Sequence, residues 1–303
     1  MMKENIGKYA RLGLVHHLLY PRCLEDAAYH FETLREFVKR DDIETFDCCL
    51  PFEEPYKRKA MEAVRDSGKE VVYSMHIFPL DKISLGSDSP REQKLIRLYL
   101  QDQIAAAAAI GAKGFVFSSG RDVPAPERPA ALKNFRNLCK WLCPELAKHG
   151  ITALLEPFDR EFDKKFLYGP TPECMELINS LEPEIVNFGI ELDIAHLPLM
   201  GESFEKAIST VKPKLKRMHI GNCVMKDSSS KWRGDTHPPV GFAGGEIDVP
   251  ELTEVLRLAL RAGYLNKEQR GALVLEMLPF PDMTVEETIR DSAKRLEEAW
   301  KLA

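Results

Sequence analysis

Five ionisable residues end or directly follow apolar segments that are typical of buried strands. They stand in the runs LLEP (Glu156), ELDIAH (Asp193 and His196), RMHI (His219) and LVLE (Glu276). Carboxylates and imidazoles are the donors that cations such as Mn²⁺, Mg²⁺, Co²⁺ and Zn²⁺ bind. If these segments are parallel strands of one sheet, their carboxyl ends bring the side chains together, where three carboxylates repel one another unless a cation lies between them. The pattern therefore predicts a divalent metal site.

A cation held there would chelate two adjacent oxygens of a polyol or hydroxy-ketone and stabilise the enediolate that forms on loss of a C–H proton. Glu156 and Glu276 come from strands on different sides of the site, so we expect one to abstract the proton and the other to return it. Return to the opposite face gives epimerisation, and return to the neighbouring carbon gives aldose–ketose isomerisation. Loss of a β-leaving group gives lyase chemistry. The residues leave these three outcomes open.

Other polar residues near the same strand ends are candidates for substrate binding. His76 ends the third apolar segment, and His196 follows Asp193 by three residues. Arg233, Asp235 and His237 stand together in RGDTH, after the seventh segment. We expect His76, His196, Asp235 and His237 to hydrogen-bond substrate, and Arg233 to offset negative charge on it.

Two further pairs are interpreted from strand alternation, which sends neighbouring side chains to opposite faces. His16 and His17 end the first segment, so only one can face inward, and we favour His16 as a substrate ligand. Glu191 and Arg217 each stand two residues before a candidate ligand and should point into the interior. We predict that they form a buried ion pair beneath the metal, without binding it.

The elements that position these residues alternate along the chain. The expected strands are Arg11–His16, Ile43–Cys49, Glu70–His76, Gly114–Ser118, Ile151–Glu156, Asn187–Asp193, Leu215–Ile220 and Ala272–Glu276. The expected helices are Glu25–Arg40, Pro55–Ser67, Pro90–Ile110, Pro129–His149, Thr171–Leu181, Ser203–Val211, Val249–Ala262 and Thr284–Leu302. Ser89 and Thr171 each precede a proline, which predicts two helix N-caps.

Eight strand–helix repeats within 303 residues predict an α/β fold, a closed parallel (β/α)8 TIM barrel in a single domain spanning residues 1–303. An open doubly wound sheet is the rival, but no GxGxxG motif follows the first segment. The long irregular stretch 221–247, rich in Gly and Pro, is expected to be an active-site loop. It follows the seventh strand, on the face where barrel active sites lie.

Composition narrows the function classes. Lys plus Arg number 42 and Asp plus Glu 47, for a net charge of −5, which argues against nonspecific nucleic-acid binding. No apolar run has the roughly 18 residues of a membrane helix, and no signal peptide is evident. The seven cysteines form no CxxC motif, so a reducing cytoplasm is the expected location.

The sequence resembles the xylose-isomerase-like TIM-barrel superfamily, which contains sugar isomerases and epimerases, inosose-processing enzymes and zinc-dependent apurinic endonucleases. The residues that carry the resemblance are Glu156, the D-x-x-H of Asp193 and His196, His219 and Glu276. In the epimerase branch, the residues matching Glu156, Asp193, His219 and Glu276 bind one metal ion. The residue matching His196 contacts substrate.

The resemblance implies a metal-dependent isomerase or epimerase of a sugar, keto-sugar or cyclitol, with one divalent ion for which Mn²⁺ is favoured. A lyase or dehydratase acting on an oxidised sugar, glycoside or inosose is the runner-up, followed by a non-catalytic sugar-binding barrel. The endonuclease branch has an extra histidine after its fourth strand, where this chain has Ser118 and Ser119. Nucleic acid and membrane are not expected partners, and the family implies association into homo-oligomers.

Overall fold

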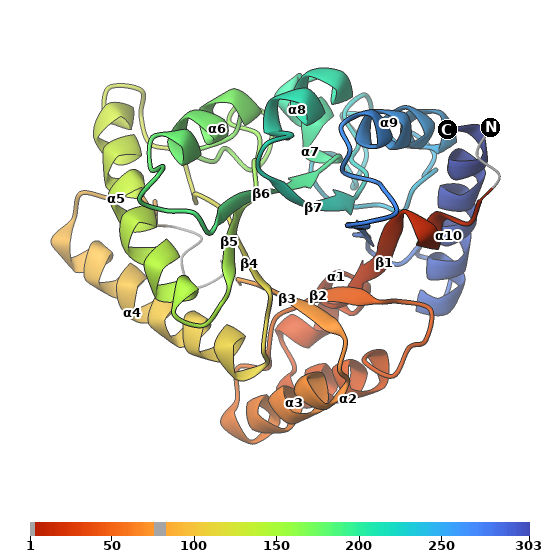
Figure 1. Cartoon of the computed structure of the whole chain (residues 1–303), viewed down its shortest axis with the longest axis horizontal. Helices are drawn as coiled ribbons and strands as arrows, with labels where there is room; N and C mark the ends of the chain where they lie inside the picture. Colours follow the sequence, from red (N-terminus) through yellow and green to blue (C-terminus); the bar gives the residue numbers. More distant parts are fainter. Residues whose placement is uncertain (1–3, 76–82) are drawn as a thin grey trace.

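The computed structural model describes residues 4–75 and 83–303 of the chain. Its strands are all parallel and close into a barrel in sequence order, as the alternating pattern predicted (Figure 1). They are β1 (Ala10–Val15), β2 (Thr45–Cys48), β3 (Glu70–Ser74), β4 (Gly114–Phe117), β5 (Thr152–Leu155), β6 (Phe188–Asp193), β7 (Leu215–Ile220) and β8 (Gly271–Leu275). The (β/α)8 fold is thereby confirmed.

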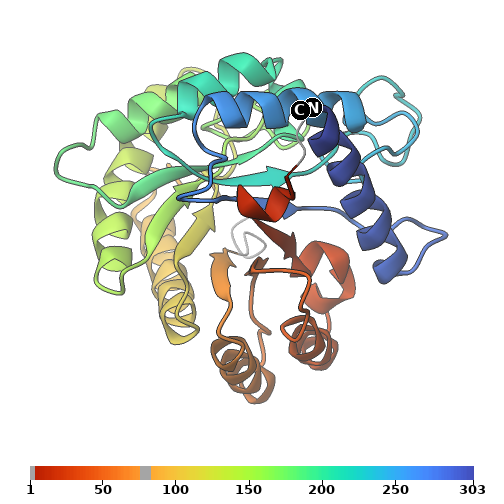
Figure 2. The same ribbon diagram turned by 45° about the vertical axis from the view of Figure 1, so that its right-hand side comes forward.

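Helices form the outer ring (Figures 1 and 2). The long ones are α2 (Ala27–Phe37), α3 (Glu54–Asp66), α4 (Pro90–Ala109), α5 (Arg128–Ala147), α6 (Thr171–Asn179), α8 (Phe204–Val211), α9 (Val249–Arg261) and α10 (Val285–Leu302). Short turns add η1 (Ile6–Lys8), α1 (His16–Leu19), η2 (Pro21–Leu24) and α7 (His196–Met200). Trp300 donates a hydrogen bond to the Glu4 carbonyl at 2.8 Å, so α10 packs beside the start of the described chain. Within the described residues, no helix is long and apolar enough to cross a membrane.

Local sequence signals set most helix starts. The Ser89 side chain accepts from the amide of Glu92 at the start of α4, as the Ser-Pro pair predicted. The prediction for α6 is displaced by one residue, because Pro170 is the N-cap and Thr171 is the first helical residue. The Thr171 amide and hydroxyl both donate to the Glu202 carboxylate instead, which satisfies them without a cap.

The barrel interior contains both apolar and charged side chains. Val72, Val116 and Leu154, on three neighbouring strands, pack into a small cluster of their own. Their strand neighbours Val71 and Phe115 belong instead to the main core. This alternation places one face of each strand inside the barrel and the other against the helices.

The largest fully buried side chain in the interior is Arg217 of β7. Its Nε and one terminal nitrogen donate to Asp47 Oδ1 of β2 at 2.8 and 2.5 Å, and the same nitrogen donates to Thr45 Oγ1 at 3.1 Å. Burial raises the pKa of the Asp47 carboxyl, but Arg217 and His219 outweigh this effect and lower that pKa below its ordinary value. A charge-assisted pair therefore crosses the barrel from β2 to β7.

The predicted pair between Glu191 and Arg217 is wrong. These two described residues are register neighbours on β6 and β7, yet Arg217 reaches across the interior to Asp47. Both carboxylate oxygens of Glu191 are buried without a hydrogen-bond partner, and the nearest charged nitrogen is His219 Nδ1 at 3.4 Å. The long side chain of Arg217 reaches across the closed barrel. Its partner therefore lies on strand β2 and not on the neighbouring strand β6.

We expect Arg217→Met to lower the free energy of unfolding by about 3–5 kcal/mol, because it leaves Asp47 buried without its cation. Arg65, exposed on α3, is the matched control, and Arg65→Met should change stability by no more than about 0.5 kcal/mol. Urea denaturation followed by circular dichroism measures both. Equal stability of the two variants would contradict the buried pair.

Candidate metal centre and active site

Four candidate ligands lie at the carboxyl ends of β5 to β8. Asp193 is the last residue of β6, and His219 is the fifth of the six residues of β7. Glu156 and Glu276 directly follow β5 and β8, and their amides continue the ladder by donating to Phe117 at 3.0 Å and Ile220 at 3.2 Å. One carboxylate oxygen from each of Glu156, Asp193 and Glu276 lies within 4.8 Å of the others. The structure thus brings these strand ends to one point.

His219 lies among three carboxylates. Its Nδ1 is 2.5 Å from Glu276 Oε2 and 3.4 Å from Glu191 Oε1, and its Nε2 is 3.3 Å from Asp47 Oδ2. Burial lowers the pKa of the imidazole, but the surrounding carboxylates raise it well above its ordinary value. A cation is therefore strongly favoured at this position, either as a protonated imidazole or as a metal bound to a neutral one.

Asp193 is held by the backbone through one oxygen only. Its Oδ1 accepts from the amides of Ala195 at 2.9 Å and Gly221 at 3.1 Å, whereas its buried Oδ2 has no hydrogen-bond partner. The close approach requires glycine at position 221, because a Cβ there would lie 2.8 Å from both carboxylate oxygens. The backbone thus aims the second oxygen while leaving it available.

A second cluster lies beside the first and consists of His196, Asp235 and His237. Asp235 Oδ1 is 3.3 Å from His196 Nε2 and 3.0 Å from His237 Nε2. Asp193 Oδ2 is 3.5 Å from His196 Nε2 and 3.6 Å from His237 Nδ1, so the two clusters share Asp193. One ligand atom from each of Asp193, His196 and His237 also lies within 4.8 Å of the others. Two of the residues expected to bind substrate, His196 and His237, therefore form a second candidate ligand set together with Asp193.

The loop after β7 is folded by its own polar contacts. Asn222 accepts from the amide of Ile247 at 2.8 Å and donates to the carbonyl of Pro239 at 3.0 Å, which ties the two ends of the loop together. His237 adopts a positive φ of 48°, a conformation that non-glycine residues adopt rarely and often at functional sites. Asp235 and His237 are consequently buried in the site, although the loop sequence is rich in Gly and Pro.

Burial and the neighbouring acids change the pKa of Glu156. Burial raises the pKa of its carboxyl to about 8, with Glu276 and Asp193 adding to the rise and His196 and His219 opposing it. Burial also raises the pKa of Asp193, again with repulsion from Glu276. Buried carboxylates at this spacing need a positive charge among them to stay ionised.

These groups surround a cavity of about 650 Å³ at the barrel mouth, lined by Glu156, His219, Asp235, His237 and Glu276. Its walls also contain residues that were not expected to bind substrate, namely the apolar Leu18, Met75, Phe158, Phe166 and Leu278 and the polar His17, Ser74, Ser118, Arg121, Asp163, Lys164 and Thr236. The mixed lining fits a polyhydroxylated ligand with a less polar face.

Lys164 contributes a cationic side chain to the cavity wall. Its ammonium lies 3.3 Å from Asp235 Oδ2 and donates to the Asp235 carbonyl at 3.1 Å. Asp159 builds its loop by accepting from the amides of Phe162, Asp163 and Lys164 at 2.8, 2.6 and 3.1 Å. Lys164 lies in a run of charged residues after Glu156, and nothing in that run distinguishes it from its neighbours as part of the cavity wall.

Two expected substrate ligands lie elsewhere, and a third cannot be placed. His16 does not line the cavity and His17 does, because β1 ends at Val15 and a helical turn begins at His16, so strand alternation no longer applies. Arg233 is exposed, with its guanidinium 4.5 Å from the Phe162 ring centroid, and is absent from the cavity wall. His76 falls outside the described residues.

The chain matches a known protein family and resembles several solved structures. Residues 36–299 match the family model described as xylose isomerase-like TIM barrel. A D-tagatose 3-epimerase-like protein superposes with a TM-score of 0.71 at 17% identity, covering 97% of this chain and 100% of its own. AP endonuclease, family 2, from Brucella melitensis gives 0.70 at 17% identity over 94% and 98%. The 3-keto-D-glucoside 4-epimerase of E. coli gives 0.68 at 15% identity over 95% and 99%. No curated protein matches the sequence.

The contact between Gly221 and Asp193 generates a double-mutant prediction. Gly221→Ala should lower the free energy of unfolding by about 1–3 kcal/mol, because the added methyl overlaps both carboxylate oxygens. In an Asp193→Ala background the overlap with the oxygens is gone and only the contact with the Ala195 Cβ at 2.9 Å remains, so the cost should fall by at least about 0.5 kcal/mol. Urea denaturation of the four proteins in chelator measures the coupling. Gly263→Ala, at an open positive-φ position, is the control and should be additive with Asp193→Ala, whereas additivity for Gly221→Ala would refute the contact.

Proposed function

This chain belongs to the xylose isomerase-like TIM barrel family, and we propose that it is a divalent-metal-dependent isomerase or epimerase of a sugar, keto-sugar or cyclitol. One observation carries the proposal: carboxylate oxygens of Glu156, Asp193 and Glu276 lie within 4.8 Å of one another, and His219 Nδ1 is 2.5 Å from Glu276 Oε2. The family match and the names of two structural neighbours, a 3-epimerase-like protein and a 4-epimerase, support the reaction class.

The residues fit a divalent cation. Asp193 Oδ2 and His219 Nε2 are buried with no hydrogen-bond partner, and so are both oxygens of Glu191 below them. Buried polar atoms are normally paired, so unpaired atoms on neighbouring acidic and imidazole side chains indicate a missing positive partner. We assign Glu156, Asp193, His219 and Glu276 as its ligands, with Mn²⁺ favoured because carboxylates outnumber imidazoles.

The carboxylates of Glu156 and Glu276 are the proposed acid–base pair. They follow β5 and β8, which are not neighbours in the barrel, and both line the cavity. A substrate lying between them presents opposite faces to the two groups, so one removes a C–H proton and the other returns one. When bound, the cation supplies Lewis acidity that stabilises negative charge developing on a substrate oxygen.

His196, Asp235 and His237 are proposed to hold substrate hydroxyls, with Lys164 orienting Asp235 from the cavity wall. Their imidazoles and carboxylate offer both donors and acceptors, as a polyol requires. Bulky walls from Phe158 and Phe166, whose ring centroids are 4.9 Å apart, shape the less polar side. A non-phosphorylated substrate fits this lining of several carboxylates better than a phosphate ester does.

A hydrolase is the second candidate, and the sharing of Asp193 by two ligand sets is the observation that favours it. Paired cations serve hydrolysis of phosphate esters by stabilising both the attacking and the leaving oxygen. The number of metal ions bound at the mouth therefore separates the two functions.

We expect the purified protein to carry about one equivalent of manganese, cobalt or magnesium at the mouth, and Glu156→Gln to lose it. Plasma mass spectrometry after dialysis measures the content. Glu161→Gln is the control, because Glu161 is an exposed carboxylate on the same loop. Two equivalents that depend on both Glu156 and His237 would favour hydrolysis, and no bound metal after incubation with any of these cations would refute the proposal.

The acid–base assignment predicts solvent exchange. Incubation of free ketoses, oxidised glycosides and inososes in D₂O should place deuterium on the carbon next to the carbonyl of the true substrate, as detected by NMR. Glu156→Gln and Glu276→Gln should each slow this exchange by about 10²–10⁴-fold, and Glu161→Gln should leave it unchanged. Exchange that persists in both glutamine variants would show that other groups move the proton.

A further inference from the structure

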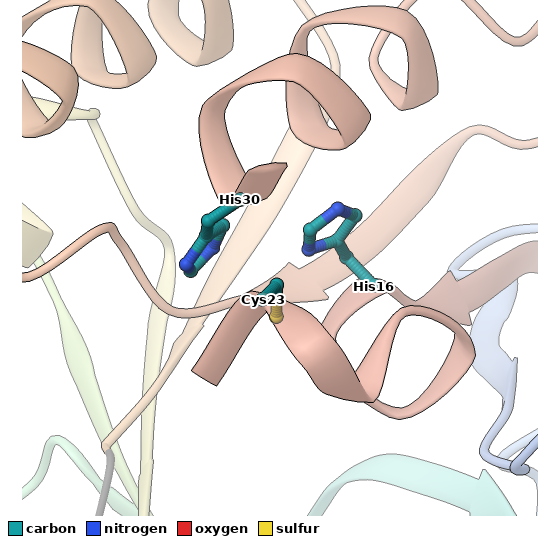
Figure 3. A group of neighbouring side chains, drawn as sticks. All are labelled: His16, Cys23 and His30. Atoms are coloured by element: carbon teal, nitrogen blue, oxygen red, sulfur yellow. The ribbon is translucent and has the colours of Figure 1, made fainter. Parts of the chain in front are cut away.

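A second group of potential ligands lies on the outer side of the barrel, away from the mouth cavity. His16 begins α1, Cys23 lies in η2 and His30 lies in α2, at equal intervals of seven residues. All three side chains are buried, and one ligand atom from each lies within 4.8 Å of the others. In Figure 3 the two imidazoles stand on either side of Cys23. Among the described residues, it is the one such group that contains a cysteine.

The tautomer of His16 is set by its surroundings. Its Nε2 lies 3.1 Å from Thr33 Oγ1, whose own hydrogen is donated to the backbone carbonyls of Tyr29 and His30. The hydroxyl oxygen must therefore accept from Nε2–H, which leaves the lone pair of the neutral ring on Nδ1. That Nδ1 is buried and has no hydrogen-bond partner.

His30 is also oriented through its Nε2. Its Nε2 lies 3.2 Å from the carbonyl oxygen of Cys49, an atom that can only accept, so Nε2 carries the hydrogen and Nδ1 the lone pair. The two rings are nearly parallel, with an interplanar angle of 19° and centroids 5.3 Å apart. An N–H donated to a carbonyl or hydroxyl is the contact that usually orients a metal-binding histidine.

The surroundings of His16 favour a neutral imidazole. Burial and the nearby His30 and His17 lower the pKa of His16 well below its ordinary value, so the ring does not become a cation by protonation. Burial also raises the pKa of the Cys23 thiol, which keeps it protonated unless a metal replaces its proton. Nothing in the mouth chemistry uses these three residues.

We propose that His16, Cys23 and His30 form a binding site for a thiophilic cation, Zn²⁺, separate from the metal centre at the barrel mouth. A set of one thiolate and two imidazoles binds Zn²⁺ in preference to the harder cations Mn²⁺ and Mg²⁺. Cys23 and His30 line a cavity of about 550 Å³, which provides an entry path for the cation. Bound zinc would tie α1, η2 and α2 together at the end of β1, releasing the thiol proton as the Zn–S bond forms.

Cobalt is the probe for this site, because a Co²⁺–thiolate bond absorbs in the near ultraviolet and nitrogen or oxygen ligands alone do not. We expect chelator-treated full-length protein to develop this band on addition of Co²⁺, and Zn²⁺ to abolish it. Cys23→Ala should reduce the band at least tenfold. Cys143→Ala, which removes a buried cysteine of α5, should retain it, and so should Cys223→Ala in the mouth loop.

Circular dichroism shows whether each variant is folded, and cobalt bound at the mouth is an internal check on Cys23→Ala. A band of equal strength in Cys23→Ala, or no band in a wild-type protein that binds cobalt at its mouth, would overturn the proposal. Neither result bears on the mouth centre, which is tested through Glu156.

X-ray absorption at the zinc edge gives a second test that leaves Cys23 intact. Zinc-loaded protein carrying Glu156→Gln, to weaken the mouth centre, should show one sulfur neighbour at about 2.3 Å with nitrogen or oxygen at about 2.0–2.1 Å. Zinc surrounded by nitrogen and oxygen alone would refute the site, and so would an absence of bound zinc.

Discussion

The concentration of buried carboxylates at one end of the barrel is the constraint on which the rest of the structure depends. Glu156, Glu191, Asp193 and Glu276 approach one another where water is largely excluded, and burial raises the pKa of three of them. Such a group stays charged only if positive charge is placed among its members. The imidazole of His219 and the proposed cation supply positive charge among the carboxylates. Charged side chains deeper in the barrel supply more.

Charged side chains also lie deeper in the barrel than the carboxylates at the mouth. Arg217 and Asp47 pair across the interior, and Asp47 then faces His219 at 3.3 Å, so the structural pair and the candidate site are electrostatically connected. Glu191 lies in the same layer with no hydrogen bond to either carboxylate oxygen. A buried acid without a partner costs free energy, and this cost is reasonable at a site that binds a cation.

Backbone geometry then decides which lone pairs remain available. Two amides engage one oxygen of Asp193 and leave the other unpartnered, and a glycine is required for that approach. The loop after β7 places Asp235 and His237 by means of Asn222 contacts and a positive φ at His237. The same principle operates at His16 and His30, where neighbouring oxygens take the Nε2 hydrogens.

The sequence by itself determined the barrel and the candidate metal ligands, because period-two apolar segments ending in Glu156, Asp193, His219 and Glu276 need only local geometry to be interpreted. The tertiary structure alone decided which charges meet. Arg217 found Asp47 across the barrel instead of Glu191 beside it, and His17 replaced His16 at the mouth because the strand ended one residue early. Local pattern specifies the direction of a side chain along its own strand, whereas Arg217 and Asp47, which closure of the barrel brings together, are 170 residues apart.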